Sequence, residues 1–185
     1  DRAFVYRWDD ADRRWRTHST LEVDEFVVID SEFGSSVAIA VGSDVDGDGV
    51  EDAIIAVGSP LNDVKGERSG AVYLYAYDPG ADQWDMIQRV NALNGSGNDL
   101  FGASLSLAGG GKYLAVGAYL SDFEDPVAQI KLVDIGSVHV FEIQDRDLDE
   151  IQPWVEIQRF RYSPDVAFES EERRVGKECR SRWSP

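Results

Sequence analysis

The sequence predicts an all-β protein, specifically a partial β-propeller of four-stranded antiparallel blades, from three observations. First, a pattern of strand-like runs, tryptophan and glycine returns with a period of about 66–70 residues. Second, short runs rich in Val, Ile, Tyr and Phe are separated by Gly, Asp, Asn and Pro, which is typical of strands and turns. Third, no window sustains the apolar spacing of an amphipathic helix. Four such strands in each repeat make one propeller blade.

The repeat is easiest to follow in three tryptophans, which lie 69 and 70 residues apart: Trp15, Trp84 and Trp154. A Phe-Gly pair follows the first two tryptophans, at residues 33–34 and 101–102, and two more strand-like runs follow each pair. Features that return in the same order indicate an array of similar units. Because the tryptophans share one place in the repeat, we expect them to pack in the core or between blades.

The recurrence predicts the boundaries of the units. Residues 1–67 would form an incomplete first blade that carries an acidic loop, residues 68–136 a second blade without it, and residues 137–169 the start of a third. About two and a half blades cannot close a ring, so we expect a fragment cut at both ends. Residues 170–185 (SEERRVGKECRSRWSP) resemble a translated sequencing adapter and are treated as a non-native tail.

Composition excludes several classes of protein. The content of 43% hydrophobic and 11% aromatic residues is enough for a core and argues against disorder. A net charge of −17 argues against nucleic acid and anionic membranes as partners. No apolar run approaches the ~20 residues of a membrane span. No serine, cysteine or histidine lies in a nucleophile motif, so we expect no enzyme. His139, in an alternating run, is expected near the surface.

Residues 44–52 (DVDGDGVED) form the one motif with a specific chemistry. Calcium takes six to eight oxygen ligands at about 2.3–2.6 Å, and carboxylates at positions 1, 3 and 5 of a tight loop can converge on it. The backbone carbonyl at position 7 and a carboxylate at position 9 would complete the shell, while the glycines permit the curvature. The expected calcium ligands are Asp44, Asp46, Asp48, Val50 and Asp52.

Alternatives to this calcium loop remain. An EF-hand needs a glutamate at position 12 and helical flanks, whereas position 12 here is Ile55 and both flanks are strand-like. Magnesium prefers octahedral sites that retain several waters. A solvated acidic hairpin that binds no ion is the other reading. The corresponding turn of the second unit, residues 108–112 (AGGGK), has no carboxylate, so we expect a metal-free glycine turn there.

Together these residues resemble the FG-GAP repeat of integrin α subunits. The resemblance covers the Phe-Gly pair, the acidic loop and residues 57–60 (VGSP) in the first unit, and extends over residues 3–160. The second unit keeps residues 101–104 (FGAS) and 116–118 (VGA) but has Tyr119 where the family usually has proline. The resemblance implies about seven blades in a closed ring, with structural calcium sites away from the ligand face.

The resemblance also implies a function. We expect a calcium-binding propeller module for extracellular protein binding or cell adhesion, located outside the cell or on its surface. Its ligand would be an extracellular protein or glycan. An accessory propeller of a secreted hydrolase or lyase is the alternative, and an intracellular scaffold is a third reading. Because fold alone does not determine function, the preference for adhesion rests on the resemblance.

Overall fold

The structure is a computed structural model, and it describes residues 1–23, 30–43, 51–125, 129–144 and 154–161. The predicted calcium ligands at 44, 46, 48 and 50 and the tail at 170–185 lie outside these described residues. Within them, the only regular element other than strands is a 3-10 turn, η1 (Gly109–Gly111). The prediction of an all-β protein is therefore confirmed. No helix in the described part of the chain is long and apolar enough to cross a membrane.

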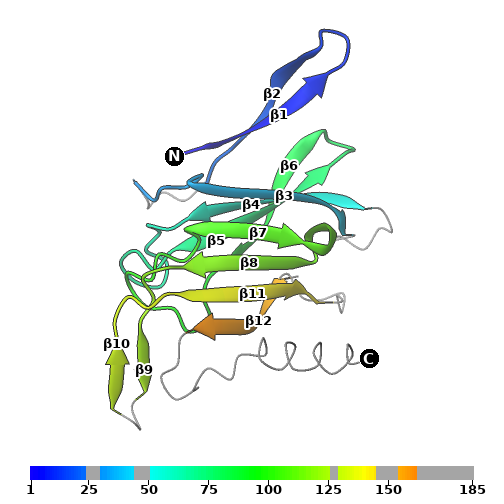
Figure 1. Cartoon of the computed structure of the whole chain (residues 1–185). Coiled ribbons are helices and arrows are strands. Elements are labelled where there is room, and N and C mark those ends of the chain that lie inside the picture. Colours follow the sequence, from blue (N-terminus) through cyan, green and yellow to red (C-terminus); the bar gives the residue numbers. More distant parts are fainter. Residues whose placement is uncertain (24–29, 44–50, 126–128, 145–153, 162–185) are drawn as a thin grey trace, which may run out of the picture.

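Two four-stranded antiparallel sheets form the centre of the molecule (Figure 1). The first sheet has the strand order β3 (Ser36–Ser43), β4 (Asp52–Ser59), β5 (Ala71–Asp78) and β6 (Gln83–Val90). The second has the order β12 (Trp154–Arg161), β11 (Ser137–Ile143), β8 (Tyr113–Ala118) and β7 (Ser104–Ala108). Two hairpins flank them, β1 (Ala3–Asp9) with β2 (Arg14–Leu21), and β9 (Phe123–Asp125) with β10 (Ile130–Leu132). Four antiparallel strands in each sheet are the architecture of propeller blades.

The boundaries of the observed sheets differ from the boundaries of the predicted units, 1–67, 68–136 and 137–169. The first predicted boundary falls between β4 and β5, inside the first sheet, and the second falls between β8 and β11, inside the second sheet. The connections from β2 to β3 and from β6 to β7 carry the chain from one sheet to the next. A repeat period gives the length of a unit, but it does not show which connection leaves the sheet.

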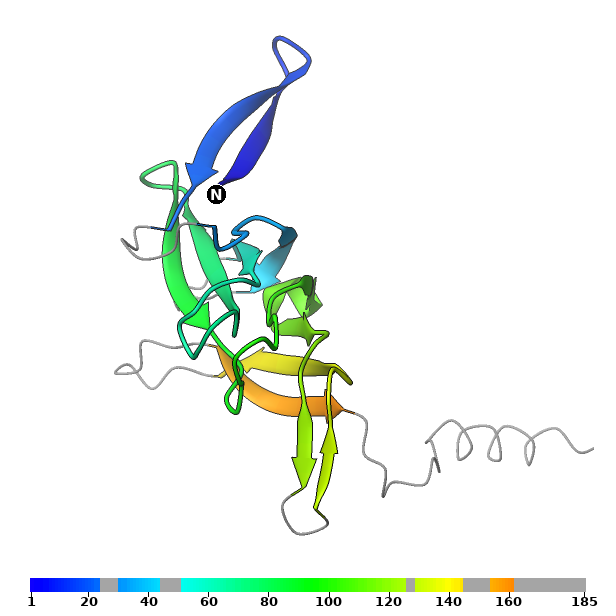
Figure 2. The same ribbon diagram turned by 90° about the vertical axis from the view of Figure 1, so that its left-hand side faces the viewer.

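The two central strands of the first sheet, β4 and β5, are buried on both faces, whereas the edge strand β3 leaves Val37, Ile39 and Val41 60–65% exposed. On β4, Ile54 and Ala56 belong to a core cluster shared with the second sheet, whereas Ile55 and Val57 belong to a cluster shared with the β1–β2 hairpin. Figure 2 shows the hairpin, the first sheet and the second sheet in succession. Because both faces of the sheet are covered at β4, this strand reads as a continuous apolar run instead of an alternating one.

The three repeat-related tryptophans differ in burial. Trp154 is 2% exposed in the core, and Trp84 is half-buried at the edge of the cluster under the hairpin. Trp15 is 67% exposed, so the expectation of core packing is wrong for this residue. It lies on a face of the β1–β2 hairpin that the described residues leave uncovered, where it contacts Trp8 edge to face at 5.6 Å.

Candidate functional site

The phenylalanine of each Phe-Gly pair is buried between neighbouring sheets. Phe33 is 4% exposed and lies edge to face against Tyr73, with 5.6 Å between ring centroids. Phe101 is fully buried and lies 5.2 Å from the ring of His139. Each phenylalanine therefore packs the connection that enters an edge strand, β3 or β7, against the sheet which that strand joins. Such aromatic contacts add about 0.5–1.5 kcal/mol to the burial itself.

The glycine of each pair is required by its backbone geometry. Gly34 and Gly102 have φ angles of 94° and 95°, a region that L side chains rarely adopt. A Cβ atom at Gly34 would lie 2.8 Å from the Arg2 carbonyl oxygen, and one at Gly102 would lie 2.6 Å from the Ala71 carbonyl oxygen. The pair thus combines a buried aromatic anchor with a close backbone approach, and it fixes the loops next to it.

A short backbone ladder joins two of these loops. Residues 98–101, which precede β7, donate to the carbonyls of residues 67–69, which precede β5. The three N–O distances are 2.7 Å from Asn98 to Glu67, 3.2 Å from Leu100 to Arg68 and 3.2 Å from Phe101 to Ser69. Gly70 and Phe101 continue the ladder as a parallel bridge. The connections of two successive blades are therefore held together by main-chain hydrogen bonds.

Beside this ladder the structure has a pocket of about 560 Å³, which we call the loop-face pocket. Its walls come from the β2–β3, β4–β5, β6–β7 and β8–β9 connections, and its lining includes Glu32, Pro60, Arg68, Asn98, Leu100 and Tyr119. The volume is within the range of small-molecule and side-chain pockets in proteins. No motif in the sequence indicated this pocket, because it is assembled from four separate connections.

Four residues of the loop-face pocket hold a left-handed backbone conformation without being glycine. Their φ angles are 54° at Glu32, 51° at Arg68, 65° at Asn98 and 56° at Leu100. For a residue with a Cβ atom this conformation costs about 1–2 kcal/mol. Strained residues of this kind persist where the surrounding structure fixes them, and they cluster at functional sites. The ladder described above supplies that fixation for three of the four.

The loop-face pocket lies where equivalent positions of two repeats meet. Glu32 precedes the first Phe-Gly pair as Leu100 precedes the second, and Pro60 follows β4 as Tyr119 follows β8. The two repeats therefore contribute different side chains from matching backbone positions. Those differences, a carboxylate against a leucine and a proline against a tyrosine, give the pocket its particular chemistry.

The described residues that flank the acidic segment lie at the opposite end of the first sheet from the loop-face pocket. Asp52 is the first residue of β4 and pairs with Ser43, the last residue of β3. Residues 44–51 therefore connect two antiparallel strands, in agreement with the strand-like flanks that argued against an EF-hand. Both strands have their other ends, at Ser36 and Ser59, on the side of the pocket. Figure 1 shows β3 spanning this distance.

The corresponding turn of the second sheet is built from glycine, as the sequence predicts. Gly109, Gly110 and Gly111 all have positive φ angles and form η1, which closes the β7–β8 hairpin. A Cβ atom added to Gly42 would lie 3.2 Å from the Cα atom of Gly110, so this turn packs closely against the end of β3. Among the residues that the structure describes, no group of three His, Cys, Asp or Glu side chains could hold a metal ion.

Comparison with known families decides what the repeat is. Residues 33–75 match a family model described as the FG-GAP repeat, and residues 84–141 match a second model with the same description. Together the matches cover more than half of the chain and include both Phe-Gly pairs. This chain is an FG-GAP repeat protein. FG-GAP repeats are typical of extracellular or cell-surface proteins. A comparison with curated proteins gave no match.

The FG-GAP core contains a buried histidine, and the expectation of a surface position is wrong. His139 is fully buried, whereas its neighbour Val138 is 43% exposed. Its Nδ1 atom lies 2.8 Å from Glu156 Oε1, and its Nε2 atom lies 2.9 Å from Ser137 Oγ. Because both ring nitrogens have partners, the histidine is tolerated on the core face of β11. The order serine, histidine, carboxylate is that of a catalytic triad, but Ser137 is only 7% exposed, so a substrate has no access.

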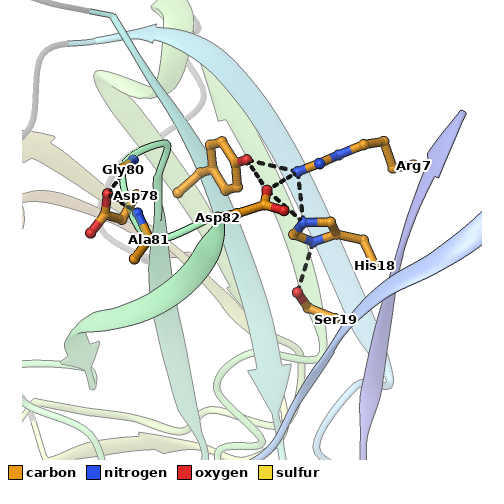
Figure 3. A network of polar contacts seen from close by, with 8 residues as sticks. Arg7, His18, Ser19, Asp78, Gly80, Ala81 and Asp82 are labelled. Carbon is orange, nitrogen blue, oxygen red and sulfur yellow. Dashed lines mark hydrogen bonds and ion pairs between the residues drawn. The ribbon is translucent and has the colours of Figure 1, made fainter. Parts of the chain in front are cut away.

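A polar network joins the first FG-GAP sheet to the β1–β2 hairpin (Figure 3). Arg7 Nη2 donates to Asp82 Oδ1 at 2.6 Å and to the Tyr77 hydroxyl at 2.7 Å, and His18 Nε2 lies 3.1 Å from the same Asp82 oxygen. The Arg7 hydrogen bond, followed by those of Tyr77 and His18, holds the pKa of Asp82 well below its ordinary value. Exposed ion pairs add little stability, so we assign the network a role in orienting the hairpin.

The seam between the two sheets also holds two carboxylates with opposite pKa shifts. At Glu156 burial raises the pKa, but hydrogen bonds from His139 and from the Leu93 backbone N–H outweigh it, and the net shift is downward. At Asp99 burial dominates and raises the pKa, against a hydrogen bond from the Ser96 backbone N–H. An acid with a lowered folded-state pKa stabilises the fold once ionised, and an acid with a raised one does the reverse.

Glu156→Gln and Asp99→Asn should therefore change stability in opposite directions at pH 7. For Glu156→Gln we expect a loss of about 1–2 kcal/mol in the free energy of unfolding, because a charged hydrogen bond becomes neutral. The difference in the free energy of unfolding between this variant and the wild type should shrink as pH falls below the ordinary glutamate pKa of about 4.3. For Asp99→Asn we expect a small gain. Urea unfolding at pH 7 and pH 3 measures both, and equal losses in the two variants would contradict the assignment.

Proposed function

We propose that this FG-GAP chain is a calcium-stabilised, non-enzymatic propeller module that binds an extracellular protein through its loop face. The observation that carries the proposal is the loop-face pocket, formed by the connections of successive blades at the end of the strands away from the acidic hairpin. Loops held on a rigid scaffold are the usual place for binding residues. Cell adhesion is the biological role that fits such a module on the cell surface.

The described residues at the base of the acidic hairpin fit a calcium loop. Ser43 and Asp52 pair across β3 and β4, so the residues between them form a loop closed at its base. The ion would be held by the carboxylates of Asp44, Asp46, Asp48 and Asp52 and by the Val50 carbonyl. Calcium would supply positive charge that offsets the repulsion of four carboxylates, about 1 kcal/mol for each pair at ~4 Å in water.

The second sheet supports a structural role for the ion. There η1, with three glycines and no carboxylate, closes the equivalent β7–β8 hairpin by backbone conformation alone. In the first sheet, a bound metal ion would close the hairpin by holding its acidic residues together. The FG-GAP family is typical of extracellular proteins, and extracellular calcium modules bind with dissociation constants of about 10⁻⁴–10⁻³ M.

Asp48→Ala should abolish stabilisation of the chain by calcium. For the wild type we expect a higher melting temperature in millimolar calcium than in EDTA, because a ligand that binds only the folded state stabilises it by RT ln(1 + [L]/Kd). A hundredfold excess over the dissociation constant would give about 2.7 kcal/mol. Thermal unfolding followed by circular dichroism in both buffers measures the difference.

The matched control is Glu51→Ala, which removes the same charge from the same loop at a position outside the expected ligand set. This variant should keep most of the calcium-dependent shift. Identical melting of the wild type in calcium and EDTA would refute the metal site. An equal loss in both variants would mean that net charge, and not coordination, is responsible.

A further inference from the structure

The loop-face pocket contains a cation, Arg68, whose side chain has no ion-pair partner among the described residues. Among the described residues, no carboxylate or hydrogen-bond acceptor contacts the guanidinium of Arg68, although the chain has 35 acidic residues against 18 basic ones. The other charged residue that lines the pocket, Glu32, makes no ion pair with it. In a protein with a net charge of −17, an arginine that lines a pocket and pairs with no described carboxylate is available for a ligand.

The backbone of Arg68 is held from both sides. Its N–H donates to Asp63 Oδ1 at 2.7 Å, and its carbonyl accepts from the Leu100 N–H at 3.2 Å. These bonds keep the residue at φ 51°, a conformation that alanine or glutamine would find as unfavourable as arginine does. The base of the side chain is therefore fixed relative to Leu100, the apolar residue on the adjacent wall, which is 8% exposed.

The remaining walls define the kind of ligand. Asn98 offers a side-chain amide with two donors, and Tyr119, 59% exposed, offers an aromatic surface. An arginine fork pairs with a carboxylate through two parallel hydrogen bonds. A phosphate would bring more negative charge toward an already acidic protein, so the overall field favours the single charge of a carboxylate.

We propose that the loop-face pocket binds the carboxylate side chain of an aspartate or glutamate in an extended peptide of the partner protein. Arg68 pairs with the carboxylate, the Asn98 amide donates a further hydrogen bond, and Leu100 and Tyr119 contact the stem of the side chain and the adjoining backbone. The inference rests on the proposed function, since it names the chemistry that the partner presents to the loop face.

The test is an NMR titration of the ¹⁵N-labelled full chain with two peptides, acetyl-Gly-Ser-Asp-Gly-Ser-amide and its Asn counterpart. We expect saturable shifts of the amide signals of residues 67–70 and 98–101 with the Asp peptide. Binding of the Asn peptide should be at least tenfold weaker, because it lacks the charge that pairs with Arg68. Equal affinities, or no saturable shift with either peptide, would overturn the proposal.

Three variants complete the experiment. Arg68→Gln should weaken binding tenfold or more. Arg68→Gly should do the same while leaving the melting temperature equal or higher, because glycine relieves the strain at φ 51°. The control Arg14→Gln, on the β1–β2 hairpin, should bind as the wild type does. Retained binding in Arg68→Gly, or tenfold tighter binding of a phosphoserine peptide, would overturn the assignment. The calcium dependence of melting is measured separately, so the two proposals can fail independently.

Discussion

Replacing Trp154 with alanine is expected to lower the free energy of unfolding by about 3–5 kcal/mol. The same replacement at Trp15, the equivalent residue two repeats earlier, is expected to cost less than about 1 kcal/mol. The contrast follows from burial, since the Trp154 side chain is 2% exposed and the Trp15 side chain is 67% exposed. Two residues with the same place in the repeat would thus differ several-fold in their contribution to the free energy of unfolding.

Hydrogen bonds add to the burial of Trp154. Its indole Nε1 donates to the Gly111 carbonyl at 3.2 Å, so the side chain reaches the turn that closes the β7–β8 hairpin. Its backbone N–H and carbonyl both bond to the Gln88 side chain amide at 2.9 Å, across the seam to β6 of the first sheet. Removing the indole would leave a cavity beside groups that anchor two sheets together.

Urea unfolding followed by far-ultraviolet circular dichroism measures both variants without relying on tryptophan fluorescence. Trp15→Ala serves as the control, because it removes the same side chain from an exposed position. Similar losses in the two variants would show that the hairpin carrying Trp15 is packed in solution in a way that the structure does not show.

Gly102→Ala is expected to destabilise the chain by about 2–4 kcal/mol. A Cβ atom at this position would lie 2.6 Å from the Ala71 carbonyl oxygen, and φ at 95° is itself unfavourable for alanine. Because the atom that it meets belongs to the backbone of β5, no rotamer change relieves the contact. The chain must move β7 or β5, and it then loosens the loop that carries Asn98 and Leu100.

The control for Gly102 is Gly80→Ala in the β5–β6 turn. There the nearest atom to an added Cβ is a carboxylate oxygen of Asp78, at 3.2 Å, and a side chain can give way. We expect this variant to lose no more than about 1 kcal/mol. Thermal unfolding of the two variants in the same buffer gives the comparison. If Gly102→Ala melted at the wild-type temperature, the close approach at the Phe-Gly pair would not be a requirement of the fold.

Several features follow from the sequence because they are local or periodic. The short β-branched and aromatic runs gave the all-β class, and the spacing of the tryptophans gave the array of units. Residues 108–112 contain enough glycine to form the compact turn found at η1. The residues on either side of 44–51 read as strands, and β3 and β4 are found there. The calcium ligands in that loop stay a prediction, to be tested by Asp48→Ala.

Tertiary structure decided the features that depend on what covers a strand. Alternation along β11 separates Val138 from His139, but it does not say which of them faces the neighbouring sheet. The partners on β12 and the side chain of Phe101 make the core face acceptable for the histidine. In the same way, Trp15 and Trp154 share a repeat position and differ only in what lies against them.

The loop-face pocket is the clearest example of a feature that the sequence alone does not reveal. Arg68 is unremarkable in its own segment. Its charge, unpaired among the described residues, has meaning only beside Asn98, Leu100 and Tyr119, which lie on other connections. Backbone hydrogen bonds between residues 67–69 and 98–101 bring these connections together. Local chemistry therefore determined the strands, turns and repeat of this protein. Long-range packing of one blade on the next decided which faces are buried and where a ligand can bind.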